Sequence, residues 1–343
     1  MRPGPEALLV ATVEAPLPGA EAPVMTYGSL IQRRGTRLVV RDPSGRRPDR
    51  EFPAPWPAEF GTVTVAPSGD LAVFAGVHAA VAVDGAGVTR WELRHGCWSE
   101  TVCEVGHESF TEYAGDRHHQ HADRGSAAFS PDGRLLRLHV RAGDEEEWLV
   151  VDPADGAVLG RAPTGTVGSA SCHCPHPDPS RMALTVAEGE EGSPVLWGHW
   201  DGEALTVRRH PEEILLGVSP DGESYLTTDL GQGTLYLNRT SDGATLRELD
   251  SVDGSPWDFE GAVPENGFAV VGTEDGSRHW LIDLTTMTAS GPITYPFPVT
   301  GTARTASPGL WYTVDRGWTA VHLWKPVRHG RVERTARRSA VHR

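Results

Sequence analysis

The sequence predicts an all-β fold, a seven-bladed β-propeller of four-stranded antiparallel blades with an inserted loop between blades two and three. A unit of short strand, turn and second strand recurs along the chain, most clearly around Phe129–Gly133 and Val218–Gly222. The prolines that anchor these units stand at positions 23, 67, 131, 177, 220, 264 and 308, so the intervals are 44, 64, 46, 43, 44 and 44 residues. A period near 44 residues matches one four-stranded blade, and seven anchors predict seven blades.

Each unit contains the signals of a blade. Proline fixes φ, and Asp-Gly suits the tight turn between the first and second strands. In the third unit the expected strands are Gly125–Ser130, Leu135–Val140, Glu147–Asp152 and Ala157–Ala162. Later third strands carry a tryptophan or tyrosine, which we expect to pack between blades, at Val195–His199, Thr234–Arg239, His279–Leu284 and Thr319–Trp324. No helix of useful length is expected.

The apolar segment Ala7–Glu14 lies too far before Pro23 to be an innermost strand like the others. We expect it to pair with Thr319–Trp324 in the last blade. Such pairing would close the ring and remove two exposed sheet edges at once.

The composition excludes several classes of protein. The 343 residues carry a net charge of −15 and contain no apolar run long enough to span a membrane, and Met1–Val13 lacks the pattern of a secretory signal. We therefore expect a soluble, cytoplasmic and monomeric protein that binds neither membrane nor nucleic acid, because phosphate contact needs a clustered positive field. Residues 1–326 would form one propeller domain, and the arginine-rich tail 327–343 would be flexible.

The repeated Ser-Pro-Asp-Gly and Ser-Pro-Gly anchors resemble those of WD40-type and TolB-type β-propellers over roughly residues 7–326. The resemblance is one of fold. The dipeptides Trp200-Asp201 and Trp257-Asp258 do not stand at the regular place of WD40 repeats, and no Gly-His pair begins the blades. Because proteins of this kind mostly serve as interaction platforms, the resemblance implies a binding function and names no substrate.

The long interval of 64 residues contains an insert at about residues 95–124, where function is expected because insertions on rigid scaffolds often carry it. Thiol and imidazole groups are concentrated there, at Cys97, Cys103, His107, His118, His119 and His121. A second group, Cys172-His173-Cys174, stands where the innermost strand of blade four is expected. Connections from an outermost to the next innermost strand share one face of a propeller, so the two groups should meet at the mouth of the channel.

Sulfur and imidazole ligands suit Zn or Cu. The sequence therefore predicts a metal site drawn from these nine residues, with Cys172, Cys174 and one or two of His118, His119 and His121 at its centre. Regular alternation along the strand would put Cys172 and Cys174 on one face and His173 on the other. Two alternatives stay open: the thiols are small buried hydrophobic groups, or Cys97 with Cys103, or Cys172 with Cys174, forms a redox pair.

Common catalytic signatures are absent from the sequence, including the nucleophile elbow, the phosphate loop and the HExxH motif. No nucleotide, flavin or PLP cofactor is expected, and Lys325 is the one lysine of the chain. Three functions remain: a platform that presents a protein or small-molecule site at the channel mouth, a metal-dependent enzyme, and a metal-handling or redox-sensing protein. In an enzyme, an open metal position would bind water or substrate, and the general base would be Glu108, Glu112 or Asp123.

Overall fold

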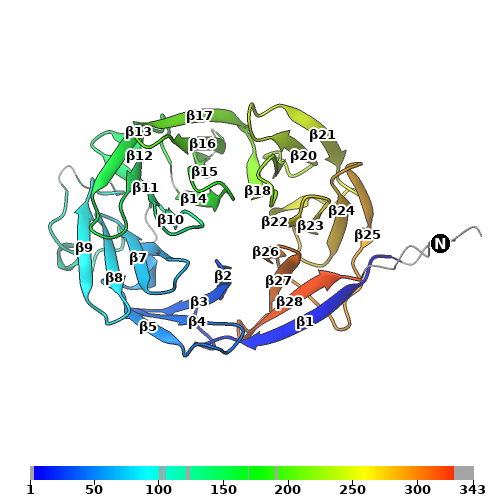
Figure 1. The fold of residues 1–343 in the computed structure, drawn as a ribbon, viewed down its shortest axis with the longest axis horizontal. Coiled ribbons are helices and arrows are strands. Elements are labelled where there is room, and N and C mark those ends of the chain that lie inside the picture. Colours follow the sequence, from blue (N-terminus) through cyan, green and yellow to red (C-terminus); the bar gives the residue numbers. More distant parts are fainter. Residues whose placement is uncertain are drawn as a thin grey trace, which may run out of the picture.

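The computed structural model describes residues 4–99, 103, 106–120, 124–168, 170–189 and 192–327. The strands of these residues form seven four-stranded antiparallel sheets arranged as blades around an axis (Figure 1). The predicted fold class, a seven-bladed β-propeller, is confirmed. The tail from residue 328 onward lies outside the described residues.

Every blade is a meander in which strands adjacent in sequence are adjacent in the sheet, except where β1 joins the last blade. Blade 1 comprises β2 Val24–Thr26, β3 Ser29–Arg34, β4 Arg37–Arg41 and β5 Arg50–Pro53. Blade 2 comprises β6 Gly61–Val65, β7 Leu71–Gly76, β8 Ala79–Asp84 and β9 Thr89–Arg94. Blade 3 comprises β10 Ala127–Phe129, β11 Leu136–Ala142, β12 Glu145–Val151 and β13 Val158–Pro163. Blade 4 comprises β14 Ala170–Pro175, β15 Arg181–Ala187, β16 Pro194–Trp200 and β17 Leu205–Glu212. Blade 5 comprises β18 Ile214–Val218, β19 Ser224–Thr228, β20 Thr234–Arg239 and β21 Thr245–Asp250. Blade 6 comprises β22 Trp257–Glu265, β23 Phe268–Thr273, β24 His279–Asp283 and β25 Thr288–Pro292. Blade 7 comprises β26 Arg304–Ser307, β27 Leu310–Val314, β28 Ala320–Pro326 and β1 Ala7–Glu14.

The anchor prolines mark the turn between the first and second strands in most blades. Pro67, Pro131, Pro177, Pro220 and Pro308 lie in that turn, and Pro264 is the last but one residue of β22. The exception is Pro23, which precedes β2. In blade 1 the turn is made by Tyr27 and Gly28, whose φ angles of 47° and 75° are those of a two-residue hairpin with both central residues left-handed.

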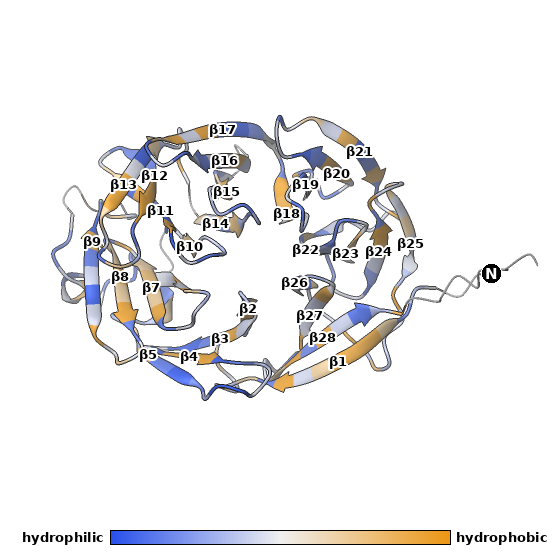
Figure 2. Cartoon of the chain, viewed as in Figure 1, coloured by the Kyte–Doolittle hydropathy of each residue, from blue (hydrophilic) through white to orange (hydrophobic). Residues whose placement is uncertain are grey.

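The core consists of hydrophobic clusters between neighbouring blades. Leu136 and Leu149 of blade 3 pack against Val73 of blade 2, and Trp197 of blade 4 packs against Tyr225 of blade 5. Figure 2 shows this pattern as apolar inner strands such as β7 and β18, whereas the outer β5 is hydrophilic. Of the predicted aromatic wedges, Trp197, Trp280 and Trp324 are buried in such clusters, and Tyr236 is half-buried.

The first strand closes the ring as expected. β1 pairs antiparallel with β28, with Leu9 opposite Trp324 and Val13 opposite Val321 (Figure 1). Val13 also packs against Leu30 of blade 1, so the closing strand contributes to the interface on both of its sides. The outer edge of β28 is thereby covered by a strand from the opposite end of the chain.

Two single 3₁₀ turns, Ala58–Phe60 (η1) and Phe110–Glu112 (η2), lie wholly within the described residues. Within that part of the chain no helix has the length and apolar character required to cross a membrane.

Candidate metal centre

The insert connects β9, the outermost strand of blade 2, to β10, the innermost strand of blade 3. Its first residues remain bound to both blades: the Gly96 N–H donates to the Arg141 carbonyl of β11 at 2.8 Å, and the Trp98 N–H donates to the Val77 carbonyl at 3.0 Å. Cys97 stands between these two hydrogen bonds and is buried. The blades therefore fix the position of the first candidate ligand.

Aromatic side chains hold the rest of the insert against blades 1 and 2. Tyr113 is buried in the cluster between these blades, and Phe110 meets Phe60 edge to face at 4.9 Å. The Tyr113 hydroxyl lies 2.6 Å from Nδ1 of His78, which follows β7 in blade 2. The Tyr113 ring stacks on His119 at 4.8 Å and 22°. These aromatic residues fasten the insert to the ring and at the same time orient a histidine.

Four residues of the insert bring their ligand atoms together. The candidate ligand atoms of Cys97, Cys103, His107 and His119 all lie within 4.8 Å of one another. The Cys103 Sγ is 3.4 Å from His107 Nε2 and 3.2 Å from His119 Nε2, and the two Nε2 atoms are 3.2 Å apart. Among the described residues this is the one group of three or more His, Cys, Asp or Glu side chains placed to hold a metal ion.

These separations fit a tetrahedral zinc ion. Zn–N bonds of about 2.05 Å and Zn–S bonds of about 2.3 Å at tetrahedral angles require N···N, N···S and S···S separations of about 3.3, 3.6 and 3.8 Å. The measured N···N and N···S distances of 3.2 to 3.4 Å are close to these values. A Cys₂His₂ set with this geometry is typical of zinc.

Both imidazoles are oriented by carboxylates. The Nδ1 of His107 lies 3.2 Å from Glu112 Oε2, and the Nδ1 of His119 lies 2.9 Å from Asp116 Oδ2. A carboxylate accepts the Nδ1 proton, so in each ring the lone pair is on Nε2, the atom that faces the cluster. Two Nε2 lone pairs facing each other at 3.2 Å repel unless a cation or a proton lies between them.

The two orienting carboxylates are themselves held in place. Glu112 accepts backbone N–H bonds from Glu108 and Ser109, and it closes a capping box with Ser109 around η2. The backbone N–H of His118 and the ring of His119 keep the pKa of Asp116 below its usual range. This outer layer of hydrogen bonds is the arrangement that fixes histidine ligands in metalloproteins.

The thiol of Cys97 is not a reactive nucleophile without a cation. Burial raises its pKa to about 12, although the Ser99 N–H, 3.3 Å from Sγ, opposes the shift. A zinc ion would reverse this balance, because a coordinating thiol is deprotonated outright. All four cysteines of the chain are free, so neither predicted redox pair is present as a disulfide.

The thiols of β14 are not part of this group, contrary to the expectation that they form its centre. Cys174 packs into the cluster between blades 4 and 5, where burial raises the pKa of its thiol to about 12. Cys172 is exposed, and its thiol lies 3.7 Å from the His173 carbonyl. His173 points to the other face of the strand, as alternation predicts, and both of its ring nitrogens are in use. The Trp148 Nε1 donates to Nε2 at 2.9 Å, and Nδ1 lies 2.8 Å from Ser126 Oγ.

The two segments do meet through their backbones. Arg124, at the end of the insert, forms an isolated parallel bridge with Ala170 at the start of β14. The ligands nevertheless separate, because β14 directs its thiols away from the insert. His118 is exposed and outside the group, and His121 and Asp123 lie outside the described residues.

The two described candidates for a general base have structural roles here. Glu108 forms an ion pair with Arg94 and is 80% exposed. Glu112 orients His107, and Asp116 does the same for His119, a role that the sequence did not predict for either acid. The signal available for Asp116 was its spacing, three residues before a histidine within a turn.

Comparisons with known proteins identify the fold. No family model matches the chain, and no curated protein matches it. Among solved structures it is similar to the crystal structure of BBS1N in complex with ARL6DN, soaked with mercury, with a TM-score of 0.55 and 10% sequence identity over 94% of this chain and 97% of that chain. This likeness supports the propeller fold, as the sequence resemblance implied.

Proposed function

We propose that this chain is a β-propeller scaffold that presents a protein-binding surface on the face where its insert emerges, and that a structural zinc ion held by Cys97, Cys103, His107 and His119 folds that insert. The observation that carries the proposal is the pair of imidazole Nε2 atoms and a thiol sulfur at tetrahedral separations, with both rings oriented by carboxylates. Such a site would act together with the aromatic contacts of Phe110 and Tyr113 to hold the insert in one conformation.

A structural role follows from the number of ligands. Catalytic zinc sites use three protein ligands and leave a position for water or substrate, whereas four protein ligands close the coordination sphere. Four ligand atoms lie within 4.8 Å of one another here, which is the number that a closed site requires. The metal-dependent enzyme considered from the sequence would need an open position, which this ligand set does not provide.

A partner on this face is consistent with the propeller architecture. BBS1N, one of the solved structures with a similar fold, was crystallised in complex with ARL6DN. In the present chain, the insert is the main departure from the regular repeat and connects blades 2 and 3 while packing on blades 1 and 2. A large irregular loop on a rigid ring is the kind of surface that carries recognition.

The zinc part is tested by metal analysis of protein purified without a histidine tag. The expected result is one zinc per chain, lost in Cys103→Ser and His119→Ala and retained in the control Cys172→Ser, whose thiol lies outside the group. Protein free of zinc, copper, nickel and iron, with the cysteines reduced, would contradict it. Retention of the metal by His119→Ala would show that other residues bind it.

The scaffold part is tested by comparing what co-purifies from cells of the source organism with wild type, His119→Ala and Cys172→Ser. A partner bound through the insert should be recovered with wild type and Cys172→Ser and be lost with His119→Ala. Recovery of the same proteins with all three would contradict a binding surface built on the insert.

A further inference from the structure

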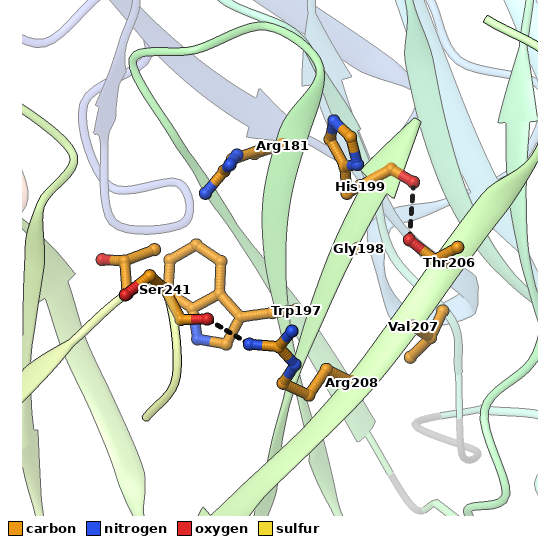
Figure 3. Close-up of a pocket in the computed structure, with 9 residues that line it drawn as sticks. Arg181, Trp197, Gly198, His199, Thr206, Val207, Arg208 and Ser241 are labelled. Carbon is orange, nitrogen blue, oxygen red and sulfur yellow. Dashed lines mark hydrogen bonds between the residues drawn. The ribbon is translucent and has the colours of Figure 1, made fainter. Parts of the chain in front are cut away.

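A cavity of about 380 Å³ is lined by residues of blades 4 and 5 (Figure 3), whereas the candidate metal centre packs on blades 1 and 2. Arg181 begins β15 directly after the first turn of blade 4, and His199 is the last but one residue of β16, before its third turn. In an antiparallel meander these two turns share one face, and the connection between blades leaves from the other. The cavity therefore opens toward the face opposite the insert.

Two guanidinium groups line the cavity on either side of an indole. In Figure 3, Arg181 and Arg208 flank the ring of Trp197. The indole is held rigidly, because His176 meets it edge to face at 5.8 Å and Tyr225 packs on it at 5.3 Å. Since the indole lines the cavity, it offers a flat apolar wall beside two cations.

The positive charge of this wall is incompletely neutralised. Arg181 forms a long ion pair with Asp178, whose Oδ2 lies 3.6 Å from the Arg181 Nε, and this Nε has no hydrogen-bond partner among the described residues. Arg208 donates to the Ser241 carbonyl, and no ion pair joins it to a carboxylate of the described residues. The neighbouring Asp242 is paired with Arg239 at 2.7 Å.

A buried hydroxyl on the same cavity also lacks a partner. Thr240 is 5% exposed, lines the cavity and has no hydrogen bond from or to its Oγ1 in the described part of the chain. Buried polar groups are nearly always satisfied, and an unsatisfied one in a native protein calls for a ligand or water. A hydroxyl and guanidinium N–H groups are all donors suited to an oxyanion.

We propose that this cavity binds a small organic anion whose phosphate or carboxylate is held by Arg181, Arg208 and the Thr240 hydroxyl while its flat apolar part lies against Trp197. The volume is within the range of small-molecule sites, which combine an apolar wall with a few polar groups. Guanidinium groups suit both oxyanions because they donate paired hydrogen bonds. The proposal is independent of the zinc site, which lies on other blades.

The test follows the indole N–H signal of Trp197 by NMR during titration with phenyl phosphate, inorganic phosphate and phenol. Phenyl phosphate should shift the signal saturably and bind more tightly than either probe alone, because it combines the anion with the ring. Arg181→Gln and Arg208→Gln should each weaken its binding about tenfold, since a charge-assisted hydrogen bond contributes about 1.5 kcal/mol or more.

The matched control is Arg34→Gln, which removes the same charge from an exposed position on blade 1. It should leave the affinity unchanged. Binding of phosphate and phenyl phosphate with equal affinity would assign the site to free inorganic anions and overturn the role of Trp197. The absence of saturable binding, or an equal loss in Arg34→Gln, would overturn the site altogether.

Discussion

The Nε2 atoms of His107 and His119 lie 3.2 Å apart, and on the far side of each ring Nδ1 faces a carboxylate. The two imidazoles thus present lone pairs to a common point, beside the thiol of Cys103. Without a cation this geometry is costly, because the two lone pairs repel each other. With a cation it is favourable, because the carboxylates raise the basicity of the rings. The relationship links the fold of the insert to the proposed zinc ion.

The exit of the insert depends on a glycine. A Cβ on Gly125 would lie 1.9 Å from the His139 carbonyl oxygen and 2.8 Å from the Trp98 ring. Because one of these neighbours is backbone, Gly125→Ala should lower the free energy of unfolding by about 3 kcal/mol. Gly115 is the matched control within the insert, since a Cβ there meets nothing within 4 Å. Chemical denaturation measures both variants, and equal stability of the two would contradict the close approach.

Ring closure by β1 predicts opposite outcomes for two valines of one strand. Val13 is 8% exposed and packs between blades 7 and 1, whereas Val10 is 46% exposed. Val13→Asp buries a charge and should cost about 3 kcal/mol of unfolding free energy or more. Val10→Asp should change it by about 0.5 kcal/mol at most. If both variants had the unfolding free energy of wild type in chemical denaturation, β1 would not be part of the core.

The buried imidazole of His173 predicts a pH dependence of stability. Burial holds its pKa well below the ordinary value, so the native state stays neutral while the unfolded chain binds a proton below about pH 6.5. The stability that depends on the neutral ring is present above this pH and is lost as the pH falls, by up to about 1.4 kcal/mol per pH unit.

His173→Gln keeps a donor for Ser126 and an acceptor for Trp148 and removes the titrating group. Between about pH 7.5 and pH 5.5 its unfolding free energy should fall by about 1 kcal/mol less than that of wild type. Acid release of the proposed zinc ion would affect both proteins alike and would cancel in the difference. Parallel pH profiles would show that His173 gains a proton in the native state.

The repeat was readable from the sequence because turn chemistry is local. Pro131 and Pro220 lie in the predicted turns. Pro23 does not mark the turn of blade 1, because Tyr27 and Gly28 make that turn. The position of the insert followed from the one interval that departs from the period.

The candidate ligand set was only partly readable. Cys97, Cys103, His107 and His119 were among the nine predicted residues and are the ones brought together. The choice among them depends on tertiary contacts: Tyr113 stacks on His119 and leaves His118 outside, and Trp148 occupies His173. Neither contact can be predicted from the spacing of residues in the sequence. The same holds for the cavity on blades 4 and 5, because Arg181 and Arg208 come from different strands and Thr240 from the next blade.

X-ray absorption at the zinc edge of untagged, purified protein tests the metal centre most directly. The expected first shell contains two sulfur atoms at about 2.3 Å and two nitrogen atoms at about 2.0 to 2.1 Å. Cys103→Ser should lower the sulfur count, and Cys172→Ser should leave the shell unchanged. A shell of oxygen atoms, a sulfur contribution that disappears in Cys172→Ser, or protein that carries no zinc would contradict the proposed centre.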